Sequence, residues 1–170
     1  MRRSSTAAVP DVVKAAAAGP PCVVRIRPAP PAPANVAPPM RIAQALIDEI
    51  VAHALEDAPN ECCGMIAARD GEAVTVHRAR NAAASPLRYE IDGKEQYELQ
   101  TAIEDAGQDL GAIYHSHTRS APYPSQTDIN LAFYPESLYV IVGVKNRDAP
   151  EVKAYRIVDG QVSEAELQVS

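Results

Sequence analysis

Proline is distributed very unevenly along this chain of 170 residues, and the distribution limits where a folded core can form. Nine of the fifteen prolines lie in residues 1–39, among alanines and few large hydrophobic side chains. Such a segment cannot bury enough apolar surface to offset the entropy that it loses on ordering. We therefore expect residues 1–39 to be a disordered extension, or the product of a mis-called upstream start, and residues 40–170 to form the folded domain.

The charge of the chain divides at the same boundary. Residues 1–39 carry a net charge of +4, which leaves −10 for residues 40–170 because the whole chain carries −6. A protein domain that binds nucleic acid normally presents a basic surface, whereas this domain is acidic. We therefore expect no nucleic-acid partner.

Hydrophobicity and cysteine content limit the cellular location. The longest apolar runs, such as Leu138 to Val144, are far shorter than the roughly 18 residues that a membrane span requires. Two of the three cysteines, Cys62 and Cys63, are adjacent, so no disulfide framework can be drawn. These features predict no membrane partner and a protein of a reducing compartment, the cytoplasm.

Helical and extended patterns alternate through the domain. Apolar and polar residues predict helices over residues 42–57, 94–109 and 125–133. Short β-prone runs predict strands over residues 62–68, 73–79, 110–115, 138–144, 152–158 and 161–169. Two of the intervening turns have the sequence Asp-Gly, which is typical of hairpins. Helices placed among hairpins indicate an α/β (α+β) fold of three layers with a mixed β-sheet.

The most informative residues are two histidines, His115 and His117, at the end of the strand predicted over 110–115. Side chains two residues apart on a strand project from the same face, so both imidazoles can reach one point. Asp128 follows in the first turn of the helix predicted over 125–133. Two imidazoles and one carboxylate leave the fourth tetrahedral position of zinc open to water, as in catalytic zinc sites. The pattern therefore predicts one Zn2+ ion with a hydrolytic role.

Hydrolysis at such a site also needs a group that takes a proton from water and passes it to the leaving amine. Glu61 stands at the start of the strand predicted over 62–68, where a rigid element can hold it. Glu56, Asp57 and Glu90 are alternative acids that spacing alone does not exclude.

Ser125 is the second candidate for a catalytic role. Its hydroxyl can donate a hydrogen bond to a developing oxyanion. The same residue, with Asp128 three positions later, also fits a capping box at the start of a helix. The two roles are compatible, and the capping interpretation alone does not account for the two histidines.

Taken in order, Glu61, His115-Ser116-His117, Ser125 and Asp128 resemble the signature of the JAMM (MPN+) metalloproteases, Glu followed by His-Ser/Thr-His-x7-Ser-x2-Asp. Two longer segments also look like the Mec branch of this family in actinobacteria. They are Glu-Cys-Cys-Gly at 61–64 and Tyr-Arg-Ile-Val-Asp-Gly at 155–160. The similarity covers about residues 40–170, so the preceding extension lies outside it.

This resemblance implies a cytidine-deaminase-like three-layer fold with a curved mixed sheet flanked by helices. It implies that His115, His117 and Asp128 bind zinc, that Glu61 is the general base and acid, and that Ser125 polarises the scissile carbonyl. The implied activity is hydrolysis of the amide bond between a ubiquitin-like sulfur-carrier protein and a cysteine at its C-terminus. That reaction releases cysteine and belongs to cysteine biosynthesis.

Other functions stay open at this point. The same chemistry could act on another ubiquitin-like isopeptide or on a peptide. The fold could instead serve as a non-catalytic MPN scaffold or binding module, which would bind little zinc. A zinc nucleoside deaminase is not favoured, because no Pro-Cys-x-x-Cys motif follows the histidines. For the leading function, we expect the extended carrier tail to add as a strand beside the sheet or to bind along residues 81–91, in either case by main-chain hydrogen bonds.

The remaining reactive side chains have simpler structural interpretations. We expect His53 and His77 to be structural or surface residues. Cys62 and Cys63 are adjacent on a predicted strand and therefore face opposite sides. This places one thiol in the core and allows the other to line the site.

Overall fold

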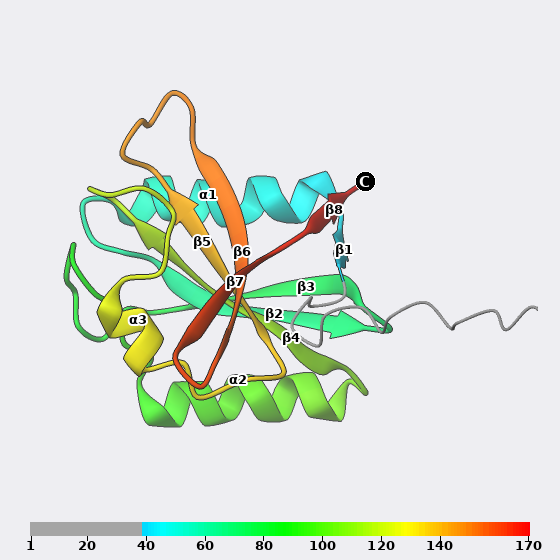
Figure 1. The fold of residues 1–170 in the computed structure, drawn as a ribbon. Helices are drawn as coiled ribbons and strands as arrows, with labels where there is room; N and C mark the ends of the chain where they lie inside the picture. Colours follow the sequence, from blue (N-terminus) through cyan, green and yellow to red (C-terminus); the bar gives the residue numbers. More distant parts are fainter. Residues whose placement is uncertain (1–38) are drawn as a thin grey trace, which may run out of the picture. The chain divides into compact units, whose positions relative to one another are not determined.

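The computed structural model describes residues 39–170, so the disordered extension predicted over 1–39 lies outside the described residues except for Pro39. The described part forms three helices and eight strands (Figure 1). In chain order they are β1 (Met40–Ile42), α1 (Gln44–Asp57), β2 (Cys63–Arg69), β3 (Glu72–Ala79), α2 (Gly93–Asp105), β4 (Asp109–His117), α3 (Gln126–Asn130), β5 (Leu138–Gly143), β6 (Glu151–Val158), β7 (Gln161–Ala165) and β8 (Leu167–Val169). Within residues 39–170, no helix is both long enough and apolar enough to cross a membrane.

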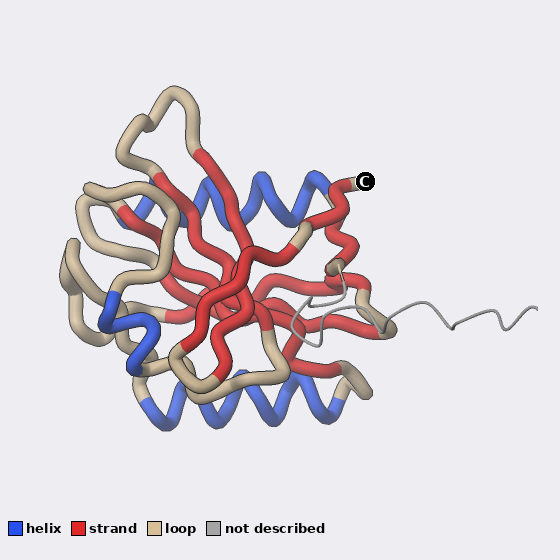
Figure 2. The backbone as a smooth tube through the Cα atoms, viewed as in Figure 1, coloured by secondary structure: helices blue, strands red, loops and turns tan. Residues whose placement is uncertain are grey.

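All eight strands belong to one mixed sheet with the order β7-β6-β5-β4-β2-β3-β1-β8. β4 and β5 are parallel, as are β1 and each of its neighbours, and the other pairs are antiparallel. The strands at the two ends of this order, β7 and β8, are separated in the chain by Glu166 alone. The sheet therefore curves until its ends nearly meet (Figure 2), which confirms the expected curved sheet.

The sheet lies between α1 and α2, which confirms the three-layer architecture (Figure 1). Alternate side chains of β4 pack on opposite faces of the sheet. Ala112 and Tyr114 pack in the core cluster that contains Ile50 of α1. Ile113 belongs to a separate cluster on the opposite face, against which Ile129 of α3 packs. Because His115 and His117 share the alternation of Ile113, they lie on the face covered by α2 and α3.

Two predicted helices begin or end in the wrong place. The helix predicted over 42–57 begins at Gln44, because Met40–Ile42 forms a strand between β3 and β8. The helix predicted over 94–109 ends at Asp105. Gly107 follows with φ +65°, the left-handed conformation that commonly ends helices.

The third predicted helix and the last strand also need correction. The helix predicted over 125–133 ends at Asn130. The strand predicted over 161–169 is divided at Glu166 into β7 and β8, because β8 leaves β6 and pairs with β1. Pairing with a distant segment leaves no mark on local hydrophobic periodicity, so the sequence pattern does not show this division.

Gly64 on β2 lies where the sheet leaves no room for a side chain. A Cβ atom there would lie 2.3 Å from the carbonyl oxygen of His77 and 2.5 Å from Cε1 of Tyr114. Because a backbone oxygen cannot move aside as a flexible side chain does, Gly64→Ala should lower the free energy of unfolding by about 1–3 kcal/mol in urea denaturation. Gly93→Ala is the matched control, since a Cβ there meets no atom within 4 Å. Equal stability of the two variants would contradict this packing.

Candidate functional site

Three strand ends meet at one edge of the sheet and bring the predicted site residues together. β4 and β5 run parallel, so their carboxyl ends and the loops that follow them lie at the same edge. β2 runs antiparallel to β4, so its amino end reaches this edge as well. Ligands of open α/β sheets commonly bind beyond the carboxyl ends of the strands. This edge is therefore where the fold favours a site.

His115, His117 and Asp128 form a compact group at that edge. The Nε2 atoms of the two histidines lie 3.2 Å apart. Asp128 places Oδ2 3.3 Å from Nε2 of His117 and Oδ1 3.5 Å from Nε2 of His115. In a tetrahedral site with metal–ligand distances of about 2.0–2.1 Å, the ligand atoms are about 3.3 Å apart. The two imidazole nitrogens thus have the spacing of two ligands of such a tetrahedron, and each lies near one oxygen of Asp128.

The group is buried, and no Lys or Arg of the described residues pairs with it. The exposed fractions of His115, His117 and Asp128 are 0%, 5% and 8%. Across residues 39–170, no fourth His, Cys, Asp or Glu joins the group. Two imidazole nitrogens and a carboxylate that converge in a buried site are costly unless a cation or proton lies between them. The residues therefore fit a metal ion with an open coordination position.

The pKa values of the three side chains are shifted by burial and by their hydrogen bonds with one another. Burial lowers the pKa of His115, which favours its neutral form, the form that binds metals. For His117, burial also opposes the charged form, but hydrogen bonds with Asp128 and Ala121 outweigh it and raise the pKa. Burial would raise the pKa of Asp128, yet its hydrogen bonds with the two histidines lower it far below its usual range.

Residues around the group orient its side chains. Nδ1 of His117 lies 3.0 Å from the carbonyl oxygen of Ala121. Because a carbonyl only accepts, this nitrogen carries the hydrogen and Nε2 keeps its lone pair for a metal. The ring of Tyr89 stacks on that of His115, with centroids 4.5 Å apart and planes inclined by 22°.

Ser125 and Asp128 hold each other at the start of α3. The backbone N–H of Ser125 donates to Oδ2 of Asp128 over 2.7 Å, and the N–H of Asp128 donates to Oγ of Ser125 over 3.2 Å. These reciprocal bonds confirm the predicted capping box. Oγ of Ser125 accepts in this contact, so its hydroxyl hydrogen can still donate to a substrate.

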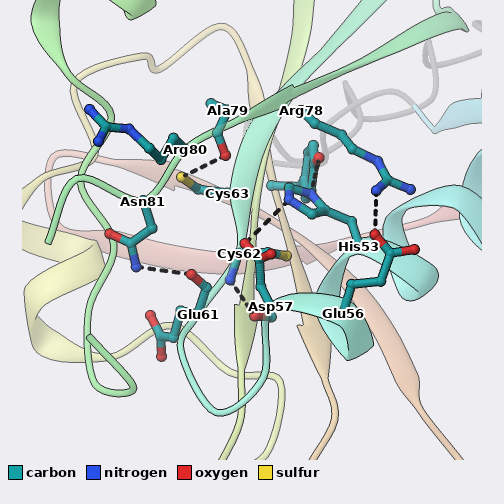
Figure 3. Close-up of polar contacts among 12 residues, drawn as sticks. His53, Glu56, Asp57, Glu61, Cys62, Cys63, Arg78, Ala79, Arg80 and Asn81 are labelled. Carbon is teal, nitrogen blue, oxygen red and sulfur yellow. Dashed lines mark hydrogen bonds and ion pairs between the residues drawn. The ribbon is translucent and has the colours of Figure 1, made fainter. Parts of the chain in front are cut away.

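Glu61 is brought to the group by the register of β2 and β4. Cys63 pairs with His115, and the two strands stay joined beyond this pair by the bond from Ser116 N–H to the Cys62 carbonyl. Glu61, two residues before Cys63, therefore lies opposite His117 on the same face of the sheet. Its carbonyl accepts a hydrogen bond of 2.9 Å from Nδ2 of Asn81 (Figure 3).

The environment of Glu61 suits proton transfer near neutral pH. The side chain is only 5% exposed, and this burial raises its pKa to about 7. A carboxyl group with this pKa can both accept and return a proton at neutral pH. The three alternative acids have partners elsewhere. Glu56 pairs with Arg78 (Figure 3) and Glu90 with Arg88, and Oδ2 of Asp57 lies 3.4 Å from Nε2 of His53.

The other reactive side chains lie outside the metal group. Cys62 belongs to the core cluster under α1, and Sγ of Cys63 lies 3.8 Å from the Ala79 carbonyl (Figure 3). Burial raises the pKa of both thiols to about 12, so neither is a ready nucleophile or ligand. His53 is buried on the other face of the sheet, where Nδ1 lies 2.8 Å from the hydroxyl of Tyr114.

Two supporting residues did not emerge from the sequence. Asn81 uses its side-chain amide to join Glu61 and Arg88, and its Oδ1 accepts from the N–H of Glu90. Ser120 places Oγ 3.1 Å from Nδ1 of His117. Both lie in loops, where periodicity carries no signal, so only the folded arrangement reveals their contacts.

The chain is similar in sequence to a known protein family and to named peptidases. Residues 43–158 match the model of a family described as prokaryotic homologs of the JAB domain. The chain is 40% identical to the CysO-cysteine peptidase of Mycobacterium tuberculosis over 126 residues, which cover 73% of this chain and 86% of that protein. It is 42% identical to a desampylase of Haloferax volcanii over 108 residues, 59% of this chain and 77% of that one.

A solved structure supports the fold. The solution structure of protein DSY2949 from Desulfitobacterium hafniense matches with a TM-score of 0.70 and 28% sequence identity. The match covers 77% of this chain and 92% of that one. The similarity therefore extends over nearly the whole of that protein.

Removal of one member of the metal group should abolish metal binding. His117→Ala and Asp128→Ala each leave two potential ligands, too few to hold an ion at an open site. Elemental analysis after dialysis should find one divalent cation per wild-type chain and almost none in either variant. Cys63→Ser is the control and should keep the metal, because Cys63 lies outside the group. Metal retention by His117→Ala would contradict the assignment.

Proposed function

Because the chain belongs to the family of prokaryotic homologues of the JAB domain, we propose that residues 40–170 form a zinc-dependent peptidase domain. Its reaction is hydrolysis of the amide bond between a ubiquitin-like sulfur-carrier protein and a cysteine at its C-terminus. The buried group of His115, His117 and Asp128, with Glu61 opposite His117, is the observation that carries this proposal. The 40% identity to a CysO-cysteine peptidase supports cysteine as the leaving group.

The protein's own residues have separate tasks in this reaction. His115, His117 and Asp128 would hold one zinc ion, which when bound makes a water molecule more acidic and polarises a carbonyl group. Glu61 takes a proton from the attacking water and returns it to the nitrogen of the departing cysteine. Ser125 donates its hydroxyl hydrogen to the carbonyl oxygen, where negative charge develops. Tyr89 covers the buried ring of His115.

The carrier tail is proposed to lie along residues 81–91. This loop is closed at its base by a β-bridge between Asn81 and Ile91. Tyr89 contacts His115, so the loop forms one wall of the site, and Leu87 on the same loop is 70% exposed. An extended tail can bind such a wall through main-chain hydrogen bonds.

A second substrate class has support from one comparison. The 42% identity to a desampylase favours a wider role in cleaving ubiquitin-like conjugates. The two functions share the metal group and Glu61 and differ in the leaving group. A non-catalytic scaffold is disfavoured, because every position of the metal and proton-transfer set is occupied by a functional residue. We place the reaction in the cytoplasm, in line with the free, buried thiols of Cys62 and Cys63.

The proposal predicts a specific loss of mass from the carrier conjugate. The zinc-loaded protein should remove one cysteine from a carrier–cysteine conjugate, as measured by intact mass spectrometry, and a chelator should stop the reaction. Glu61→Gln should keep its metal and lose turnover by roughly 10²- to 10⁴-fold, because it cannot transfer the proton.

Glu56→Gln serves as the control, since Glu56 is an exposed acid in an ion pair with Arg78 and lies outside the proposed tail-binding loop. It should cleave the conjugate at the wild-type rate. Full activity of Glu61→Gln would assign proton transfer to another acid. An intact conjugate after incubation with the zinc-loaded wild type would refute the proposed function.

A further inference from the structure

A cavity of about 370 Å³ is lined in part by Ser120 and Ala121, two residues that contact His117 of the metal group. One wall comes from Ser120, Ala121 and Pro122, in the loop after β4. The lining also includes Gly143 at the end of β5, Lys145 in the following loop, and Glu151 at the start of β6. The cavity therefore lies at the same edge of the sheet as the metal group.

The wall of this cavity is in direct contact with a metal-binding histidine. Ser120 Oγ and the Ala121 carbonyl oxygen lie 3.1 Å and 3.0 Å from Nδ1 of His117. On the neighbouring strand, Gly143 is the register partner of His117. The other histidine, His115, is instead covered by Tyr89 of the 81–91 loop. The proposed tail-binding loop thus contacts one histidine of the metal group, and residues that line this cavity contact the other.

The cavity wall is held in place by packing and by a buried hydrogen bond. The hydroxyl of Tyr155 donates to the Pro122 carbonyl over 2.6 Å. Pro122 packs so closely against β5 that a Cβ atom on Gly143 would lie 2.8 Å from its Cδ. The small side chains leave room for a compact leaving group such as a single amino acid.

The charges in the cavity match those of a free amino acid. Lys145 is the one cation among its lining residues, and Glu151 is the one anion. None of the ion pairs among residues 39–170 includes either side chain. Lys145 is exposed, so its ammonium group is accessible to a ligand that enters the cavity. An ammonium group forms strong, charge-assisted hydrogen bonds with a carboxylate.

We propose that this cavity binds the departing amino acid, and that Lys145 binds its α-carboxylate. The inference rests on the proposed function and specifies how the enzyme selects its leaving group. A conjugate that ends in cysteine carries this carboxylate close to the scissile bond. An isopeptide formed by a lysine side chain of another protein carries no carboxylate there. Lys145 thereby favours hydrolysis of conjugates with a terminal amino acid.

The test compares two substrates with wild-type protein and Lys145→Ala. The substrates are the carrier–cysteine conjugate and the same conjugate with a cysteinamide, which lacks only the negative charge. With wild type, the amide should reduce kcat/KM by roughly tenfold, the lower range for loss of a charged hydrogen bond. Lys145→Ala should lower kcat/KM for the carboxylate substrate by a similar factor, mainly through KM, and leave the amide substrate unchanged.

Two further variants control for charge and position. Lys145→Arg keeps the positive charge and should retain most of the selectivity. Lys153→Ala removes a lysine of β6 that pairs with Glu164, and it should leave both rates unchanged.

The outcomes separate this inference from the proposed function. If wild type cleaves both conjugates equally, or if Lys145→Ala slows both equally or neither, Lys145 does not bind the carboxylate, although the enzyme still cleaves carrier conjugates. If the zinc-loaded wild type cleaves neither conjugate, the proposed function itself fails.

Discussion

The alternation of side chains along β4 is the constraint on which the site depends. Residues 113, 115 and 117 face one side of the sheet, so Ile113 packs in the core while His115 and His117 converge beyond it. α3 then brings Asp128 to the same point through its capping box with Ser125. Burial of three electron-rich side chains is unfavourable without positive charge between them. Binding of a cation thus offsets a cost that the fold itself creates.

Strand direction explains how distant segments supply one reaction centre. β2 runs antiparallel to β4, so Glu61, just before β2, lies opposite His117 near the end of β4. Asn81 holds Glu61 there through a hydrogen bond to its carbonyl oxygen. β5 is parallel to β4, so the loop that follows it carries Lys145 to the same edge. The loop that we propose for the carrier tail therefore contacts His115, and the cavity that we propose for the leaving group is lined by residues in contact with His117. The order and direction of the strands, more than any local sequence, determine which loops lie beside the metal group.

The sequence predicted which residues lie together at the centre of the site, but it did not predict which residues surround them. His115, His117 and Asp128 have a spacing that translates directly into strand and helix geometry, and the structure brings them within 4.8 Å of one another. Glu61 could not be separated from Glu56, Asp57 and Glu90 by spacing, because the choice depends on the register of β2 with β4. β1 was missed, and β8 was not separated from β7, for a similar reason. Each has three residues, and their pairing joins the two ends of the domain.

The central claim is that two imidazoles and one carboxylate hold a zinc ion whose fourth position is left to solvent. X-ray absorption at the zinc edge of the metal-loaded protein tests it directly, because the spectrum reports the identity and distance of the coordinating atoms. We predict four nitrogen and oxygen neighbours at about 2.0–2.1 Å, with two of them from imidazoles and no sulfur. A sulfur neighbour at about 2.3 Å, or a third imidazole, would contradict the claim, since it would place a different set of residues around the metal.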